Sequence, residues 1–145
     1  MRVADVIRGK GSKVITVTPD TDVRTLINTL AEHKIGAVVV SVDGVSIDGI
    51  VSERDIVRAL AARGAAIVSE PVQSIMTPDV RTCEMDTHID ELMTMMTKGR
   101  FRHLPILVDG RLGGLVSIGD IVKYRVGELE EEREALSKYI TSERA

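Results

Sequence analysis

The sequence contains an internal repeat, and this repeat limits the possible folds more than any other feature. Residues 13–60 align with residues 79–126 with one single-residue gap. The alignment pairs Asp20 with Asp86, and it continues through both segments in the same order. Two homologous segments of this length predict two copies of one structural unit.

Each copy predicts the element order β-α-β-β-α from its hydrophobic spacing. The expected strands are residues 14–17, 37–40 and 47–51 in the first copy, and 80–83, 104–108 and 112–116 in the second. Asp43-Gly44 and Asp109-Gly110 predict a tight hairpin between the last two strands of each copy. A final helix is expected to begin near Asp55 in the first copy and Asp120 in the second.

The predicted fold class is α/β (α+β), with two pseudo-twofold-related β-α-β-β-α units. A unit of about fifty residues is marginally stable alone, so the two units should pack as one module. The predicted division is 1–63 for the first repeat, 64–78 for a connector, 79–127 for the second repeat and 128–145 for a helical tail.

The tail allows two interpretations. Its residues are rich in charge, which is typical of a solvated helix, but Leu129, Leu136 and Ile140 could line one narrow apolar face. Such a face would favour a contact across a homodimer.

Composition excludes several classes of protein. The net charge is −3 and the basic residues are scattered, so nucleic-acid binding is not expected. No apolar run approaches a membrane span, and the first residues lack the apolar core of a signal peptide. With Cys83 as the single cysteine, these features predict a cytoplasmic protein. With one Phe, two Tyr and no Trp, a planar ligand would rest on aliphatic walls.

The first candidate ligand-binding residues lie in the paired strand-to-helix turns. Each turn places a serine three residues before an aspartate, as Ser52 with Asp55 and Ser117 with Asp120. A carboxylate there could accept hydrogen bonds from a ribose diol, while the helix N-terminus could face a phosphate. The alternative is simple helix capping by each Ser-x-x-Asp pair.

A mismatch between the two copies is the second feature that indicates a ligand-binding site. The first copy has Gly36-Ala37 where the second has Arg102-His103. Arg102 and His103 are candidate phosphate partners. The alternative for Arg102 is an ion pair with a surface acid.

These motifs together resemble a tandem CBS domain pair, also called a Bateman module. They are Ile-Gly-Ala at 35–37, Arg-His-Leu-Pro at 102–105, Ile-Met-Thr-Pro at 75–78 and Gly-hydrophobic-Val-Ser-x-x-Asp in both copies. The resemblance implies a pseudo-symmetric module with two clefts, binding of an adenosine derivative such as AMP, ADP, ATP, NAD or S-adenosylmethionine, and pairing into a homodimer.

The resemblance also implies site residues by position. One cleft would use Asp120 for the ribose, with Ser117, Arg102 and His103 near the phosphate, and Thr16, Val17, Thr18, Ile35, Gly36 and Ala37 near the adenine. The other would use Asp55 for the ribose, with Ser52, Arg54, Met76, Pro78 and Thr82. The cleft with Asp120 is expected to be the better phosphate site.

The expected function is therefore regulatory binding of an adenine nucleotide, acting in trans on another protein. An enzyme is not expected, because the three histidines and Cys83 lack metal-site spacing and no phosphate-binding or nucleophile motif appears. The alternative function is a dimerisation or partner-binding scaffold whose clefts bind no nucleotide.

Overall fold

The computed structural model describes residues 1–11 and 13–144. The first unit contains β1 (Thr16–Val17), α2 (Val23–His33), β2 (Ala37–Val40), β3 (Gly49–Ser52) and α3 (Glu53–Arg63). The second unit contains β4 (Cys83–Glu84), α4 (Ile89–Gly99), β5 (His103–Val108), β6 (Arg111–Ser117) and α5 (Ile118–Arg144). Helix α1 (Val3–Arg8) precedes the first unit, and the 3-10 helices η1 (Ala65–Ser69) and η2 (Val72–Ser74) lie in the connector.

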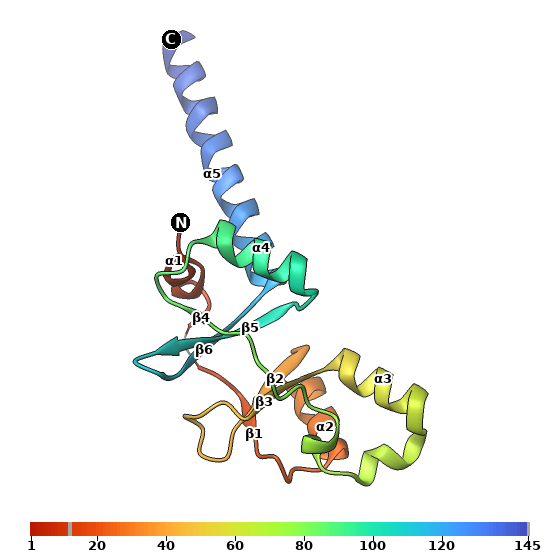
Figure 1. Ribbon diagram of the computed structural model, residues 1–145. Coiled ribbons are helices and arrows are strands. Elements are labelled where there is room, and N and C mark those ends of the chain that lie inside the picture. Colours follow the sequence, from red (N-terminus) through yellow and green to blue (C-terminus); the bar gives the residue numbers. More distant parts are fainter. Residues whose placement is uncertain (12, 145) are drawn as a thin grey trace.

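The two units have the same sheet topology (Figure 1). In each three-stranded sheet the first strand runs parallel to the middle strand, and the third strand is antiparallel to it. The middle strand β2 has all four residues buried, as its wholly apolar sequence predicts. The predicted fold class, two β-α-β-β-α units in a mixed α/β module, is confirmed.

The hairpins differ between the units. In the second unit Asp109 and Gly110 form the predicted tight turn, with φ angles of 53° and 76°. In the first unit the tight turn predicted at Asp43-Gly44 is wrong, because residues 41–48 form a wider loop. The carboxylate of Asp43 accepts hydrogen bonds from the Val45 and Ser46 N–H groups, and these bonds stabilise the wider loop.

Helix α1 packs against the second unit, although it precedes the first repeat in the sequence. The N–H groups of Val3 and Ala4 donate to carbonyl oxygens just before α4, at 2.9 Å each. Val3, Val6 and Ile7 are buried in the same core as the strands and helices of the second unit. Helix α1 therefore precedes the first copy in the sequence but belongs to the second unit by its packing.

The connector packs against the first unit, as α1 packs against the second. The Val72 N–H donates to the Thr21 carbonyl at 2.7 Å, and the Val72 side chain is fully buried in the first core. The connector also crosses β3, where Ile50 and Thr77 exchange two backbone hydrogen bonds. A Cβ at Gly49 would lie 2.9 Å from the backbone carbonyl oxygen of Thr77, which cannot move away as a side chain could, so this crossing favours glycine there.

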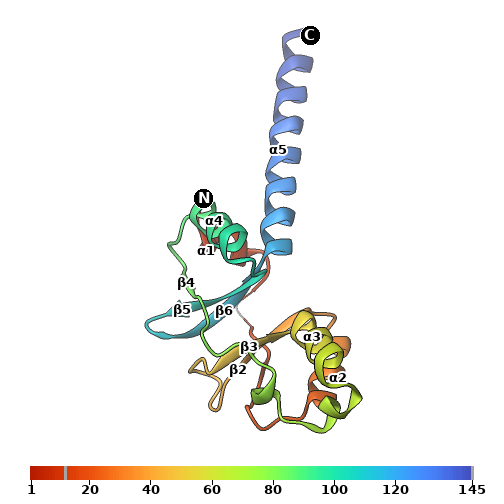
Figure 2. The same cartoon turned by 45° about the vertical axis from the view of Figure 1, so that its right-hand side comes forward.

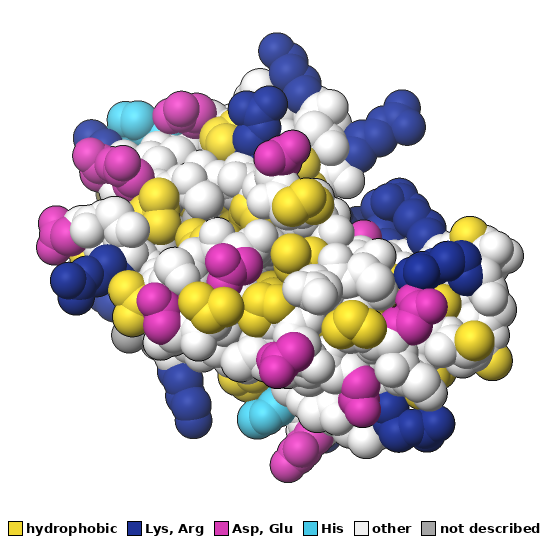
Figure 3. Space-filling view, turned by 60° about the horizontal axis from the view of Figure 1, so that its bottom comes forward, with side chains coloured by type: hydrophobic (Ala, Val, Ile, Leu, Met, Phe, Trp, Pro, Cys, Tyr) yellow, Lys and Arg dark blue, Asp and Glu magenta, His cyan; other side chains and the backbone are white. Residues whose placement is uncertain are grey.

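Helix α5 continues unbroken from the second unit through the tail, and its distal part projects from the body (Figure 2). Leu129, Leu136 and Ile140 are exposed on it. No helix among the described residues is long and apolar enough to cross a membrane. On the face shown in Figure 3, acidic and basic side chains are interspersed with hydrophobic ones.

Candidate functional site

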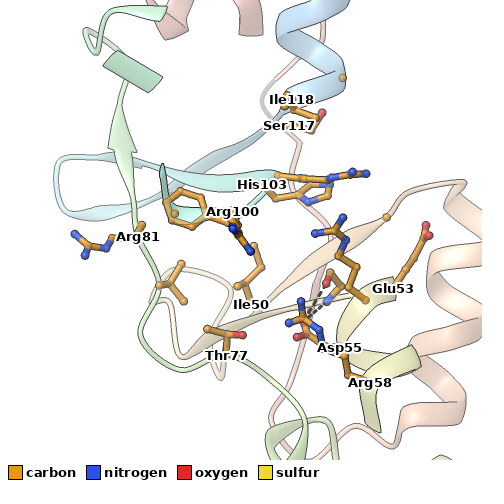
Figure 4. Close-up of a pocket in the computed structure, with 18 of the residues that line it drawn as sticks. Ile50, Glu53, Asp55, Arg58, Thr77, Arg81, Arg100, His103, Ser117 and Ile118 are labelled. Atoms are coloured by element: carbon orange, nitrogen blue, oxygen red, sulfur yellow. Dashed lines mark hydrogen bonds between the residues drawn. The ribbon is translucent and has the colours of Figure 1, made fainter. Parts of the chain in front are cut away.

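A cavity of about 710 Å³ lies between the two units (Figure 4). The first unit contributes Gly36, Ile50 and the start of α3, and the segment that precedes β4 contributes Thr77 and residues 79–81. The second unit contributes residues 99–103 and the turn 117–119. Residues from both repeats therefore face one space.

Arginine side chains dominate the charge of this cavity. Five of them line it, namely Arg54, Arg58, Arg81, Arg100 and Arg102, against the three acids Glu53, Asp55 and Asp79. All five are exposed to solvent, and none forms an ion pair with another described residue. The surface ion pair considered for Arg102 is therefore not present, and the cavity can attract an anion although the chain is acidic overall.

Asp55 stands at the start of α3 on the wall of this cavity. Its Oδ2 accepts hydrogen bonds from the Ser52 N–H at 2.8 Å and from the Ser52 Oγ at 3.0 Å. The capping role considered for this pair is thus real. Within the described chain Oδ1 has no hydrogen-bond partner, so the capped carboxylate still has one oxygen available to a ligand.

Asp120 occupies the equivalent place in the second unit, but its surroundings differ. Its Oδ2 accepts the Ser117 N–H at 2.9 Å and the Lys10 ammonium at 2.6 Å. Burial alone would raise the pKa of Asp120, but the bonds from Lys10 and Ser117 outweigh burial and lower that pKa. Asp120 is thus held as a carboxylate in an ion pair, and it is absent from the lining of the cavity.

His103 begins β5 and faces Gly36 across the two units. A Cβ at Gly36 would lie 3.7 Å from the imidazole, which is an ordinary contact distance, and 3.2 Å from Glu53 Oε1, so Gly36 lies directly beside the histidine of the second copy. Burial lowers the pKa of His103, and nearby Lys10 lowers it further, against the opposing effect of Asp120 and Glu53. At neutral pH the ring is therefore uncharged and can accept or donate a hydrogen bond.

The apolar part of the cavity is lined by Ile50, Val80, Phe101 and Ile118. The sequence predicts aliphatic walls alone, but the single Phe of the chain is one of these residues. A Cβ at Gly99 would overlap the Phe101 ring, so Gly99 permits the position of this ring. A planar group in the cavity would meet three aliphatic side chains and one aromatic ring.

The structure brings together seven of the sixteen predicted site residues. Gly36, Ser52, Arg54, Asp55, Arg102, His103 and Ser117 line the cavity. Thr16, Val17, Thr18, Ile35, Ala37, Met76, Pro78, Thr82 and Asp120 do not. Arg102 and His103, which were expected to accompany Asp120, line the same cavity as Asp55. The charge of Asp120 also acts on His103, so the expected grouping of Arg102 and His103 with Asp120 stays a prediction.

The predicted site residues do not include four basic residues of the site region, Arg58, Arg81, Arg100 and Lys10. Arg58 follows Arg54 by four residues, so the two share one face of α3, and this spacing could have indicated it. Arg81 lies just before β4, Arg100 follows α4, and Lys10 lies in the N-terminal segment. Their positions depend on how these segments cross between the units, which no local pattern reveals.

Cys83 is buried in the second core, and burial, with the neighbouring Glu84, raises the pKa of its thiol to about 12. This supports the interpretation of Cys83 as a structural residue. No group of three His, Cys, Asp or Glu side chains in the described parts of the chain could hold a metal ion.

Comparison with known proteins identifies the family. The CBS domain model matches residues 3–62 and 72–127. "CBS domain-containing protein CBSX3, mitochondrial" of Arabidopsis thaliana is 34% identical over 146 residues, covering 95% of this chain and 71% of its own length.

Two solved structures extend this likeness to the fold. The CBS-domain containing protein ATU1752 from Agrobacterium tumefaciens is 47% identical, with a TM-score of 0.83 over 86% of this chain and 99% of its own. The CBS domain pair of protein MJ0100, solved with 5′-methylthioadenosine and S-adenosyl-L-methionine, is 24% identical, with a TM-score of 0.78 over 88% of this chain and 98% of its own. The duplicated unit, the paired Ser-x-x-Asp turns and the family model agree: the chain belongs to the CBS domain family and folds as a CBS domain pair.

Proposed function

We propose that this chain is a regulatory module that binds an adenine nucleotide in the cavity between its two units. The observation that carries the proposal is the excess of arginine in this cavity, within a chain whose net charge is −3. Arginine is suited to phosphate, because its planar guanidinium group can donate two parallel hydrogen bonds to phosphate oxygens.

The number of arginines favours a polyphosphate. Arg54 and Arg58 come from α3 of the first unit, whereas Arg81, Arg100 and Arg102 come from the segment before β4 and from the second unit. A chain of phosphates could contact both groups, whereas a single phosphate could reach fewer of these side chains. We therefore rank ATP above ADP and ADP above AMP, with NAD as another candidate through its pyrophosphate. S-adenosylmethionine, which carries a sulfonium cation, should bind poorly.

The remaining groups fit the nucleoside. The free Oδ1 of Asp55 could accept a hydrogen bond from a ribose hydroxyl beside Ser52, and the adenine could rest against Ile50, Val80 and Phe101. The MJ0100 pair, solved with two adenosine-containing ligands, shows that this fold can hold an adenosine group. The residues expected near a second adenine, at 16–18 and 35–37, stay predictions.

We propose further that the module acts without catalysing a reaction, on a partner protein in trans, in a reducing compartment such as the cytoplasm. The Arabidopsis relative is, by its name, mitochondrial. The exposed Leu129, Leu136 and Ile140 on the projecting α5 support the predicted homodimer, and they are also the observation that favours a dimerisation scaffold as the alternative function.

Isothermal titration of the purified chain with ATP, ADP, AMP and S-adenosylmethionine tests the proposal. Affinity should fall in that order. Arg102→Gln should weaken ATP binding roughly tenfold or more by removing a charge-assisted contact. The matched control is Arg111→Gln, since Arg111 is exposed in the β5–β6 hairpin and does not line the cavity. If none of the four ligands binds below millimolar concentration, the scaffold is the correct function.

A further inference from the structure

The two strand-to-helix turns of the module are equivalent in sequence but not in their surroundings. At the first turn, Asp55 is bonded to Ser52 and to no cationic side chain of the described residues. At the second turn, Asp120 is bonded to Lys10, whose ammonium also donates to the Leu115 carbonyl at 2.8 Å. The difference between the turns therefore comes from outside the repeat, from the N-terminal segment.

Lys10 is held in place by the packing of α1. The helix buries Val3, Val6 and Ile7 in the second core, and the N–H groups of Lys10 and Gly11 both donate to the Ile7 carbonyl, at 2.9 and 2.8 Å. The backbone of Lys10 is thus fixed to the end of α1. The ammonium group reaches from this anchor to both β6 and the first turn of α5.

At the corresponding place in the first unit, a backbone N–H group replaces the ammonium group of Lys10. There the carbonyl of Ile50, the counterpart of Leu115, accepts the backbone N–H of Thr77 at 2.9 Å. The second hydrogen bond to Asp55 Oδ2 comes from its own neighbour, the Ser52 hydroxyl. No charge is added at the first turn, so its carboxylate can still take up a ligand hydroxyl group.

We propose that Lys10 closes the second nucleotide site of this module, so that each chain takes one nucleotide, in the cavity with Asp55. This inference rests on the proposed function. The ammonium group shares Oδ2 of Asp120 with the Ser117 N–H and neutralises the charge of the carboxylate that a second ribose would need, so only Oδ1 is left for that ribose. The side chains of the pair are 39% and 22% exposed, so they are partly removed from water. A second ribose would therefore bond to a carboxylate that Lys10 has already neutralised, and its hydrogen bond would lose the strength that a free charge gives at Asp55.

The stoichiometry of ATP binding tests this inference on the full chain. Isothermal titration of the wild type should give one ATP per chain, and Lys10→Met should give two. Asp120→Asn added to Lys10→Met should restore a stoichiometry of one, because it removes the carboxylate of the opened site. The matched control is Lys13→Met, which removes the same charge from an exposed side chain three residues away and should leave one site.

Several results would overturn the inference. Two ATP sites per wild-type chain would show that Lys10 does not close the second turn. This outcome needs no variant and therefore no folding control. One site in Lys10→Met with unchanged affinity would show the same. Weaker ATP binding in that variant would also overturn the inference, because Lys10 would then be a phosphate ligand.

Failure of the proposed function looks different, because neither the wild type nor Lys10→Met would then bind ATP. ATP binding by Lys10→Met alone, lost again with Asp120→Asn, would support the closure while refuting the site at Asp55.

Discussion

A ribose held by Asp55 requires that the chain distinguish ATP from 2′-deoxy-ATP. Oδ2 of Asp55 is already engaged by two groups of Ser52, so Oδ1 is the oxygen left for the sugar. A bond from the 2′-hydroxyl to this carboxylate is one charge-assisted hydrogen bond, which contributes about 1.5–3 kcal/mol. The deoxynucleotide should therefore bind roughly 10-fold to 140-fold more weakly.

The assay is isothermal titration of both nucleotides against three proteins. The wild type should show the full preference, and Asp55→Ala should reduce the ratio of the two affinities to about one. Asp120→Ala is the matched control, since it removes the equivalent carboxylate at the second turn, where Lys10 already neutralises its charge. Each substitution also removes a carboxylate that caps a helix, at a cost of about 1 kcal/mol in stability, and Asp120→Ala in addition breaks the ion pair with Lys10.

Two results would refute the reasoning about Asp55. Equal affinity of the wild type for ATP and 2′-deoxy-ATP would show that the carboxylate does not contact the 2′-hydroxyl group. A preference that survives Asp55→Ala but disappears in Asp120→Ala would show that the ribose lies at the second turn.

Three further predictions concern stability and reactivity. ATP at one hundred times its dissociation constant should add about 2.7 kcal/mol to the free energy of unfolding. Calorimetry should show this as a rise of roughly 5–10 °C in Tm, and an unchanged Tm would contradict binding. The pKa of His103 is lowered on folding, so the unfolded chain binds its proton first, and stability should fall as pH drops below 6.5. Urea unfolding at pH 7.5 and 5.5 should show a smaller loss for His103→Gln than for the wild type, and equal losses would count against a buried neutral ring. Ile7→Ala should cost about 2–5 kcal/mol in the same urea assay, because Ile7 is only 5% exposed in the second core, whereas a cost near zero would contradict the packing of α1.

The fold could be predicted from the sequence because its signals are local and occur twice. The apolar residues 37–40 predict β2 with its observed bounds, and Gly64 predicts the end of α3 at Arg63. The wide loop at 41–48 was missed, because Asp-Gly is a strong turn signal and the competing bonds to Asp43 come from nearby serine and valine residues. The short first strands, β1 and β4, begin later than predicted, at Thr16 and Cys83.

The site could be predicted only in part. The Ser-x-x-Asp turns and the contrast between Gly36 and Arg102 are visible in the repeat, and Gly36, Asp55 and Arg102 line one cavity. Which carboxylate shares a cavity with Arg102 depends on how the two units face each other. That Lys10 reaches Asp120 depends on α1 packing across to the second unit. Contacts at such sequence separations leave no periodicity or spacing from which they could be inferred.

The most direct test of the central claim is a crystal structure of the chain grown with ATP. The account predicts one nucleotide per chain between the units, with its ribose at Asp55 and its phosphates among Arg54, Arg58 and Arg102. Electron density for ATP at Asp120, with Lys10 displaced, would contradict the account, as would an empty cavity at an ATP concentration that saturates binding in solution.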